Sequence, residues 1–185
     1  AGMDAEALLL EPVGRNTAPA LTLAALHATG NEQDPVLVVT PADQTIADPT
    51  AFSAAMQHAI HEASTGAIVM LGITPTRPET GYGYIKAPAT HPDTRTCKVE
   101  AFIEKPDLAT ARLYLDQGGY YWNAGMFVVR ASVWLSALQC FRCDILEATR
   151  QAWAQRRCDA SFIRPDKTAF ARIPAESIDY AVMEH

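Results

Sequence analysis

An acid and a base stand side by side at the end of an apolar run. Glu104 and Lys105 follow Phe102-Ile103 and precede Pro106. In a straight strand, neighbouring side chains point to opposite faces, so this pair can serve one site only if the chain bends there. After such a bend, Glu104 could accept hydrogen bonds from sugar hydroxyls while Lys105 met a phosphate as a point charge. The alternative is a solvated ion pair at a strand end.

A carboxylate, Asp43, follows the apolar run Val36-Leu37-Val38-Val39 after three intervening residues, Thr40-Pro41-Ala42. Ligands of open α/β sheets bind at the carboxyl ends of strands. Mg²⁺ prefers one or two carboxylates together with phosphate oxygens. Asp43 is therefore a candidate ligand for a divalent cation that bridges phosphates. The alternative is an Asp that caps the following turn.

The segment from Glu11 to Thr17 precedes a predicted helix that has Pro19 in its first turn. The free amides and the dipole of a helix N-terminus favour anions or polar ligand edges. A carboxylate in this segment could accept both hydrogen bonds from the N–H and amino group of guanine. The alternative is that Asn16 and Thr17 only cap the helix while Glu11 is solvated.

Two further segments place glycine or an amide inside predicted strands. Gly81-Tyr82-Gly83-Tyr84 would let a ligand approach the backbone closely, and its aromatic rings could cover a sugar. Glycines beside strands are also common in turns. Asn123, in an apolar strand, must bond either a neighbouring backbone group or a ligand hydroxyl if it is buried.

An α/β scaffold must position these side chains. Apolar runs at 36–39 and 67–71, with helical apolar spacing at 51–63 between them, predict a βαβ unit with buried, parallel strands. The other expected strands are 82–86, 98–103 and 120–130, and the other expected helices are 20–28, 107–116, 131–139, 144–157 and 177–184. This order predicts a three-layer α/β domain with mixed strands in its second half.

The composition of the chain excludes several classes of protein. Its 185 residues, 49% hydrophobic and 19% charged, have the balance of one globular domain, which excludes disorder. A formal net charge of −6 argues against nucleic-acid and membrane partners, and no apolar run approaches the roughly 18 residues of a membrane span. Four cysteines, unevenly spaced, form neither a disulfide framework nor a zinc motif, so we expect a cytoplasmic protein.

Taken in order, six segments resemble the mannose-1-phosphate guanylyltransferases (GDP-mannose pyrophosphorylases) of the sugar-nucleotidyltransferase family. The likeness is greatest to the bacterial type that is often fused to a phosphomannose isomerase, and it runs over residues 8–184. The segments are Leu10-Glu11-Pro12-Val13-Gly14-Arg15-Asn16-Thr17-Ala18-Pro19-Ala20, Pro41-Ala42-Asp43, Gly81-Tyr82-Gly83-Tyr84-Ile85, Phe102-Ile103-Glu104-Lys105-Pro106, Trp122-Asn123-Ala124-Gly125-Met126-Phe127 and Ser177-Ile178-Asp179-Tyr180.

The resemblance implies a three-layer, Rossmann-like nucleotidyltransferase fold with a mixed sheet, and a single domain over residues 1–185. It implies that GTP and mannose 1-phosphate give GDP-mannose and pyrophosphate, with Mg²⁺ as cofactor. The implied nucleotide-binding residues are Glu11, Arg15, Asn16, Thr17 and Asp43. The implied sugar-phosphate-binding residues are Gly83, Tyr84, Glu104, Lys105 and Asn123. Asp43, as metal ligand, and Lys105 are the expected catalytic residues, and the Ser177-Ile178-Asp179-Tyr180 segment would lie near the sugar.

The family pattern extends beyond this chain at both ends. A Gly-rich loop bearing Arg and Lys would precede Leu10, and a second metal-binding Asp would follow the segment that begins at Ser177. We therefore expect an internal piece of the nucleotidyltransferase domain, with the fold incomplete at both ends.

Two other functions fit the same residues. One is a catalytically silent chain that binds sugar nucleotides or regulates a partner. The other is a related nucleotidyltransferase that uses another hexose 1-phosphate or another nucleotide. An incomplete sheet would expose an edge and apolar surface, which predicts self-association, with a homodimer as one form.

Overall fold

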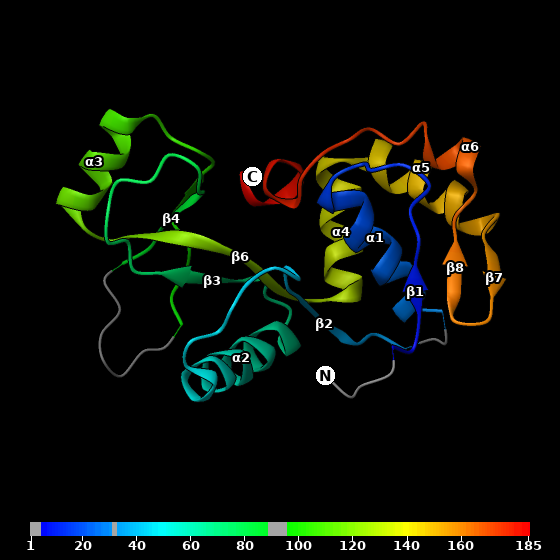
Figure 1. The fold of residues 1–185 in the computed structure, drawn as a ribbon, viewed down its shortest axis with the longest axis horizontal. Coiled ribbons are helices and arrows are strands. Elements are labelled where there is room, and N and C mark those ends of the chain that lie inside the picture. Colours follow the sequence, from blue (N-terminus) through cyan, green and yellow to red (C-terminus); the bar gives the residue numbers. More distant parts are fainter. Residues whose placement is uncertain (1–4, 31–32, 89–95) are drawn as a thin grey trace. The chain divides into compact units, whose positions relative to one another are not determined.

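The computed structural model describes residues 5–30, 33–88 and 96–185, and the chain divides into two compact units (Figure 1). The first unit comprises Ala1–Pro35 and Ala131–Met183 together with His185. The second unit comprises Val36–Arg130 together with Glu184.

The second unit is built on a five-stranded sheet in which β2, β6, β4 and β5 are neighbours in that order and β3 also pairs with β6. Its elements are β2 (Val36–Val39), α2 (Pro49–Ser64), β3 (Val69–Ile73), β4 (Tyr84–Lys86), β5 (Ala101–Ile103), α3 (Leu108–Gln117) and β6 (Tyr120–Arg130).

The long strand β6 organises this sheet. Phe127 pairs with both β2 and β3, and Trp122 pairs with both β3 and β4. Since a strand has only two edges, β3 occupies one edge of β6, and β2 and β4 share the other. On the shared edge, residues 124–126 lie between the two ladders, so a loop can reach the backbone of β6 there.

One prediction about the sheet is wrong. Strands β2 and β3 are both antiparallel to β6 and hence parallel to one another, as expected. They are not adjacent, however, because β6 lies between them. Each is therefore an edge strand among the described strands, and Val38 is 44% exposed although a fully buried strand was expected at 36–39.

Two helices cover parts of this sheet. Helix α2 packs Met56, Ala59 and Ala63 against Val128 of β6. Burial of a side chain as large as Met or Val stabilises the fold by about 1.5–3 kcal/mol. Helix α3 packs Ala111 against Tyr84 and other aromatic residues of β4 and β6. The face of β4, β5 and β6 that carries Gly83 and Asn123 is the opposite one, because side chains alternate along a strand.

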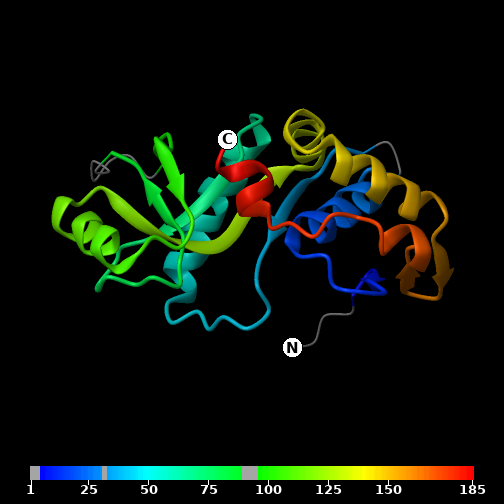
Figure 2. The same cartoon turned by 90° about the horizontal axis from the view of Figure 1, so that it is seen from above.

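The first unit packs α1, α4 and α5 on one another beside a small sheet of β1, β8 and β7. Its elements are β1 (Leu8–Leu9), α1 (Thr17–Ala28), α4 (Ala131–Phe141), α5 (Cys143–Ala154), β7 (Arg157–Asp159), β8 (Phe162–Arg164), α6 (Lys167–Phe170) and the π-helix η1 (Asp179–Met183). The fully buried Trp134 donates a 3.0 Å hydrogen bond to the hydroxyl of Thr22, which joins α4 to α1. The segment that leads to η1 runs beside the start of α1 (Figure 2). No helix in the described ranges is long and apolar enough to cross a membrane.

Candidate functional site

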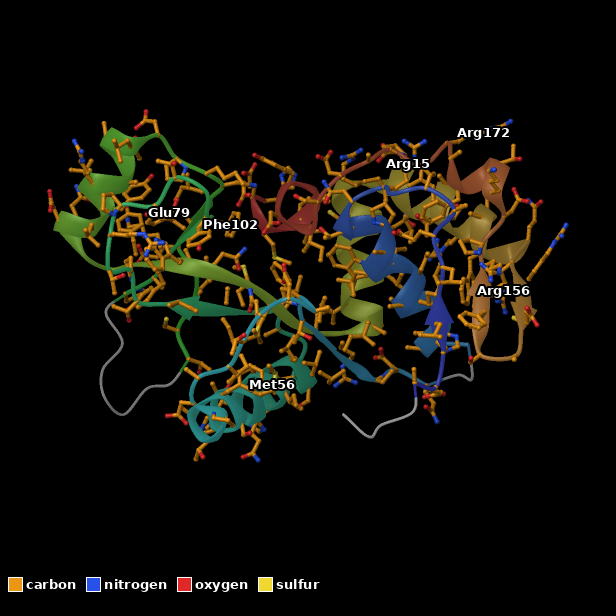
Figure 3. All side chains as sticks on the ribbon, in the orientation of Figure 1. Arg15, Met56, Glu79, Phe102, Arg156 and Arg172 are labelled. Carbon is orange, nitrogen blue, oxygen red and sulfur yellow. The ribbon has the colours of Figure 1, made fainter. Side chains whose placement is uncertain are left out.

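Three residues of the second unit, two of them predicted site residues, meet around Gly83. A Cβ atom placed on Gly83 would lie 2.6 Å from Oε2 of Glu104, 2.9 Å from Cζ of Phe102 and 3.4 Å from Cβ of Asn123. Figure 3 labels Phe102 in this part of the unit. The absence of a side chain at Gly83 therefore makes the room in which the Glu104 carboxylate sits. This carboxylate is held in place, with the Glu104 side chain only 9% exposed.

The chain bends at Lys105, as the sequence required for a shared site. Lys105 has a φ of 46°, in the left-handed region that a side chain adopts at a cost. This bend brings Nζ of Lys105 to 2.6 Å from Oε1 of Glu104, while the Lys105 side chain stays 58% exposed. The pair thus presents a sheltered carboxylate and an accessible ammonium group at one point.

Asn123 lies at a bulge in β6. The register between β3 and β6 shifts so that Gly72 pairs with Asn123 while Met70 pairs with Phe127. The backbone N–H of Asn123 donates to the carbonyl of Gly83 at 2.8 Å, and Oδ1 of Asn123 accepts from the N–H of Gly125 at 3.0 Å. Gly125 has a φ of 67°, which permits this turn.

The loop that carries Asp43 reaches the same bulge. The side-chain amide of Gln44 donates to the carbonyl of Ala124 at 2.8 Å, and Pro41 lies beside Gly125. Asp43 itself is exposed, and its carboxylate accepts no hydrogen bond from the described residues. Helix α2 is capped instead by Asp48, which accepts from Thr50 and Ala51. The Asp43 carboxylate is therefore available to a ligand.

The predicted metal role of Asp43 matches its surroundings only in part. No group of three or more His, Cys, Asp or Glu residues that could hold an ion occurs within residues 5–30, 33–88 and 96–185. A single exposed carboxylate suits a cation whose remaining ligands are phosphate oxygens and water, which is how Mg²⁺ is usually held. The donor set fits a cation that arrives with a nucleotide.

Tyr84 occupies a different place from the other predicted sugar-phosphate residues. Its side chain is fully buried on the face covered by α3. Its hydroxyl donates to the carbonyl of Glu79 at 2.9 Å and accepts from the N–H of the same residue at 3.0 Å. The structure therefore directs the Tyr84 side chain away from the face that carries Gly83. On the other face, Tyr84 anchors the turn that leads into β4. Tyr82 packs its ring edge-on against Trp122, also on that opposite face.

Three of the predicted nucleotide residues, Arg15, Asn16 and Thr17, form a tight turn at the start of α1 in the first unit. Glu11 precedes this turn in the same unit, and Asp43 lies in the second unit. Asn16 has a φ of 67°, and its side chain accepts from the N–H of Thr17 at 2.9 Å, while the Thr17 hydroxyl accepts from the N–H of Ile178 at 2.9 Å. Arg15 lies beside the segment that carries Arg172 (Figure 3) and donates to the carbonyl of Ala171. Partial burial raises the pKa of the Glu11 carboxyl above its ordinary value.

The structure thus brings together some of the predicted residues within each unit: Arg15, Asn16 and Thr17 in the first, and four of the five sugar-phosphate residues in the second. Gly83, Glu104, Lys105 and Asn123 meet in the second unit, where the loop of Asp43 adjoins them. Sequence reasoning missed Gln44, which holds the loop of Asp43, and it missed Arg142 and Glu176, which hold the turn before α1. Gln44 was detectable only as the polar neighbour of Asp43. The contact between Arg142 and Glu176 carried no local signal, since these two residues lie 34 positions apart in the chain.

Comparison with known proteins identifies the family. Residues 4–168 match the family described as nucleotidyl transferase. The chain is 55% identical over 183 residues to the xanthan biosynthesis protein XanB of Xanthomonas campestris pv. campestris strain B100, and this match covers 99% of this chain. It is 48% identical over 184 residues to the mannose-1-phosphate guanylyltransferase of Escherichia coli K12, where the match covers 97% of this chain. The chain spans 38% of the length of each of these relatives.

A solved structure has the same fold as this chain. A crystal structure described as mannose-6-phosphate isomerase from Helicobacter pylori superposes with a TM-score of 0.86 at 33% identity, covering 97% of this chain and 68% of that one. The mixed α/β architecture is therefore Rossmann-like, as the sequence predicts. The chain belongs to the nucleotidyl transferase family.

Proposed function

We propose that the protein transfers a guanylyl group from GTP to mannose 1-phosphate, giving GDP-mannose and pyrophosphate. The observation that carries this proposal is the sheltered Glu104 carboxylate in the space left by Gly83, with the accessible ammonium of Lys105 beside it. A sugar phosphate presents hydroxyls and an anion in the same close relation. The identity to a mannose-1-phosphate guanylyltransferase supports mannose as the sugar.

The sugar side of the reaction depends on positioning. Glu104 accepts hydrogen bonds from sugar hydroxyls, and Asn123, fixed by the bulge of β6, lies beside Gly83 next to it. Lys105 attracts the sugar phosphate and places its oxygen for in-line attack. That oxygen forms a bond to the α-phosphorus of GTP, while the bond from this phosphorus to the bridging oxygen breaks and pyrophosphate departs. Little proton transfer is required, so electrostatic stabilisation dominates catalysis.

The nucleotide side uses the turn before α1. Glu11 offers a carboxylate to the N–H and amino group of guanine, and the turn of Arg15, Asn16 and Thr17 presents backbone groups near a helix N-terminus. The hydrogen bonds of Asn16 and Thr17 show that their side chains shape this turn. Selectivity for guanine is therefore proposed to come chiefly from Glu11.

Nucleotidyl transferases generally use divalent metal ions, and we propose Mg²⁺ as the ion and Asp43 as its protein ligand. When bound, Mg²⁺ would neutralise charge on the phosphates. Asp43 would orient the triphosphate by this route, and Gln44 would fix the loop that carries it. The protein's location in the cytoplasm and its assembly as a homodimer stay predictions.

Release of pyrophosphate by the full-length protein tests the proposal. We expect release with GTP and mannose 1-phosphate, and much slower release when ATP or glucose 1-phosphate is substituted. Release with another hexose 1-phosphate in preference to mannose 1-phosphate would overturn the sugar assignment. GDP-mannose binding without any turnover would favour the silent, sugar-nucleotide-binding alternative.

A further inference from the structure

Two segments from distant parts of the chain lie side by side in the first unit, as Figures 1 and 2 both show. One leads into α1 and the other, residues 171–178, leads into η1. The N–H of Glu176 donates to the carbonyl of Arg15 at 3.3 Å, and the N–H of Ala18 donates to the carbonyl of Glu176 at 3.1 Å. Glu176 is thus bonded on both sides of the turn that contains Asn16 and Thr17.

This turn needs such support. Asn16 has a φ of 67° and a ψ of −172°, a backbone conformation that costs a non-glycine residue free energy unless the surroundings hold it. Its own side chain supplies one local bond, to Thr17. The remaining bonds come from the second segment, through Glu176 and through the N–H of Ile178, which donates to the Thr17 hydroxyl.

Glu176 is anchored in turn by Arg142, at the junction of α4 and α5. The Arg142 guanidinium donates to Glu176 through Nη1 and to both carboxylate oxygens of Asp144 through Nε and Nη2, at 2.9 and 2.8 Å. The backbone N–H of Arg142 donates to Leu138 at 2.8 Å, which fixes the residue to the end of α4. The side chains of Arg142 and Glu176 are only 24% and 31% exposed, so the charge-assisted contact is partly shielded from water.

We propose that Arg142 and Glu176 are positioning residues for nucleotide binding, which hold the Arg15–Thr17 turn in its binding conformation through the backbone of Glu176. The inference rests on the proposed function, because it takes this turn as part of the guanine nucleotide site. Neither residue is required to touch the nucleotide.

The test compares two ion pairs in the full-length protein, Arg142–Glu176 and a control pair on α5. We expect Glu176→Gln and Arg142→Met each to raise the KM for GTP by about tenfold, while the KM for mannose 1-phosphate stays within about twofold of wild type. The double variant should raise the KM for GTP no more than the larger of the two single changes does, because both residues act through one contact. Arg142→Lys, which keeps the charge, should recover part of the loss.

The matched control is the pair of Arg150 and Glu147, both on α5, whose side chains meet at 2.8 Å and are about half exposed. Glu147→Gln and Arg150→Met should leave both KM values unchanged. Equal rises in KM for both substrates, or an unchanged KM for GTP in variants that melt at the wild-type temperature, would overturn the inference.

Hydrogen exchange separates this inference from the proposed function. Glu176→Gln should speed exchange of the Ala18 amide, which donates to Glu176, whether or not the protein uses GTP. If wild type fails to use GTP, the proposed function fails. If Ala18 exchange is unchanged in Glu176→Gln and Arg142→Met, the proposed positioning role of Arg142 and Glu176 is wrong.

Discussion

The side-chain amide of Gln44 and the backbone carbonyl of Ala124 are joined by a 2.8 Å hydrogen bond. Gln44 directly follows Asp43, and Ala124 directly follows Asn123. The bond therefore couples the loop of the proposed metal ligand to the bulge of the proposed sugar residue. It explains how an exposed loop residue can keep a fixed relation to the sheet.

Replacement of Gln44 by alanine should weaken this coupling. A neutral hydrogen bond of this kind contributes about 1 kcal/mol, so we expect GDP-mannose binding in the presence of Mg²⁺ to fall by about fivefold. Gln57→Ala, on the exposed side of α2, is the matched control and should bind normally. Titration calorimetry measures both, and equal affinities would show that the Gln44 bond has no role in the site.

Gly83→Ala should damage the sugar site and spare the fold. The new Cβ would stand 2.6 Å from Oε2 of Glu104 and 2.9 Å from Phe102, so the carboxylate must move. We expect mannose 1-phosphate affinity to drop by about tenfold or more. Gly81→Ala, whose nearest neighbour would be Glu79 at 3.4 Å, serves as control. Wild-type affinity in Gly83→Ala would remove Glu104 from the sugar site.

Asp48→Ala should lower stability through the start of α2. Oδ1 of Asp48 accepts from the N–H groups of Thr50 and Ala51 at 3.0 and 2.9 Å. Loss of such a cap costs about 1 kcal/mol of the free energy of unfolding. Ser53→Ala, on the exposed side of the same helix, should be neutral. Urea unfolding measures the difference, and matching midpoints for Asp48→Ala and wild type would contradict it.

The pH dependence of stability should report the contact between Asp144 and Arg142. The hydrogen bond from Arg142 lowers the pKa of the Asp144 carboxyl below its ordinary value of 3.8. The ionised form is thus favoured by folding, so this stabilisation is complete above pH 3.8 and disappears as the pH falls through the lower, folded-state pKa. Since Asp144 is 53% exposed, the effect is small, below about 1 kcal/mol.

Thermal melts from pH 7 to pH 2 check this expectation. Wild type should melt above Asp144→Asn at neutral pH, and the gap should close in acid. Asp159→Asn, on the exposed strand β7, is the control. A gap that is constant over the whole range would mean that the Asp144 charge contributes nothing.

Much of the fold was predictable because its signals are local. The apolar spacing at 51–63 and the glycine pair after 107–116 predicted helices, and the aromatic run at 120–130 predicted a strand. The structure confirms them as Pro49–Ser64, Leu108–Gln117 and Tyr120–Arg130. The small sheet of β1, β7 and β8 was missed, because its strands are two or three residues long and β7 is wholly exposed. Such strands lack the alternation that a prediction needs.

The residue types of the candidate site were predictable from the sequence. The residues and strands that hold them in place were less so. The sequence predicted that Glu104 and Lys105 could share one site only if the chain bends between them, since neighbouring side chains of a straight strand point to opposite faces. The insertion of β6 between β2 and β3 was not foreseen, because strand order depends on contacts far apart in sequence. The same reason hid Glu176, whose partners Arg15 and Arg142 are distant along the chain. The buried position of the Tyr84 side chain also follows from α3, which no local pattern around Gly83 reveals.

Calorimetric titration with GDP-mannose, with and without Mg²⁺ and with UDP-glucose as the comparison ligand, measures the proposed sugar-nucleotide site itself. We expect selective binding of GDP-mannose, strengthened by Mg²⁺ in wild type and much less so in Asp43→Asn. Glu104→Gln should abolish most of the selectivity for the sugar. Equal binding of UDP-glucose would rule out the proposed sugar and base selectivity, and an undiminished effect of Mg²⁺ in Asp43→Asn would rule out Asp43 as the metal ligand.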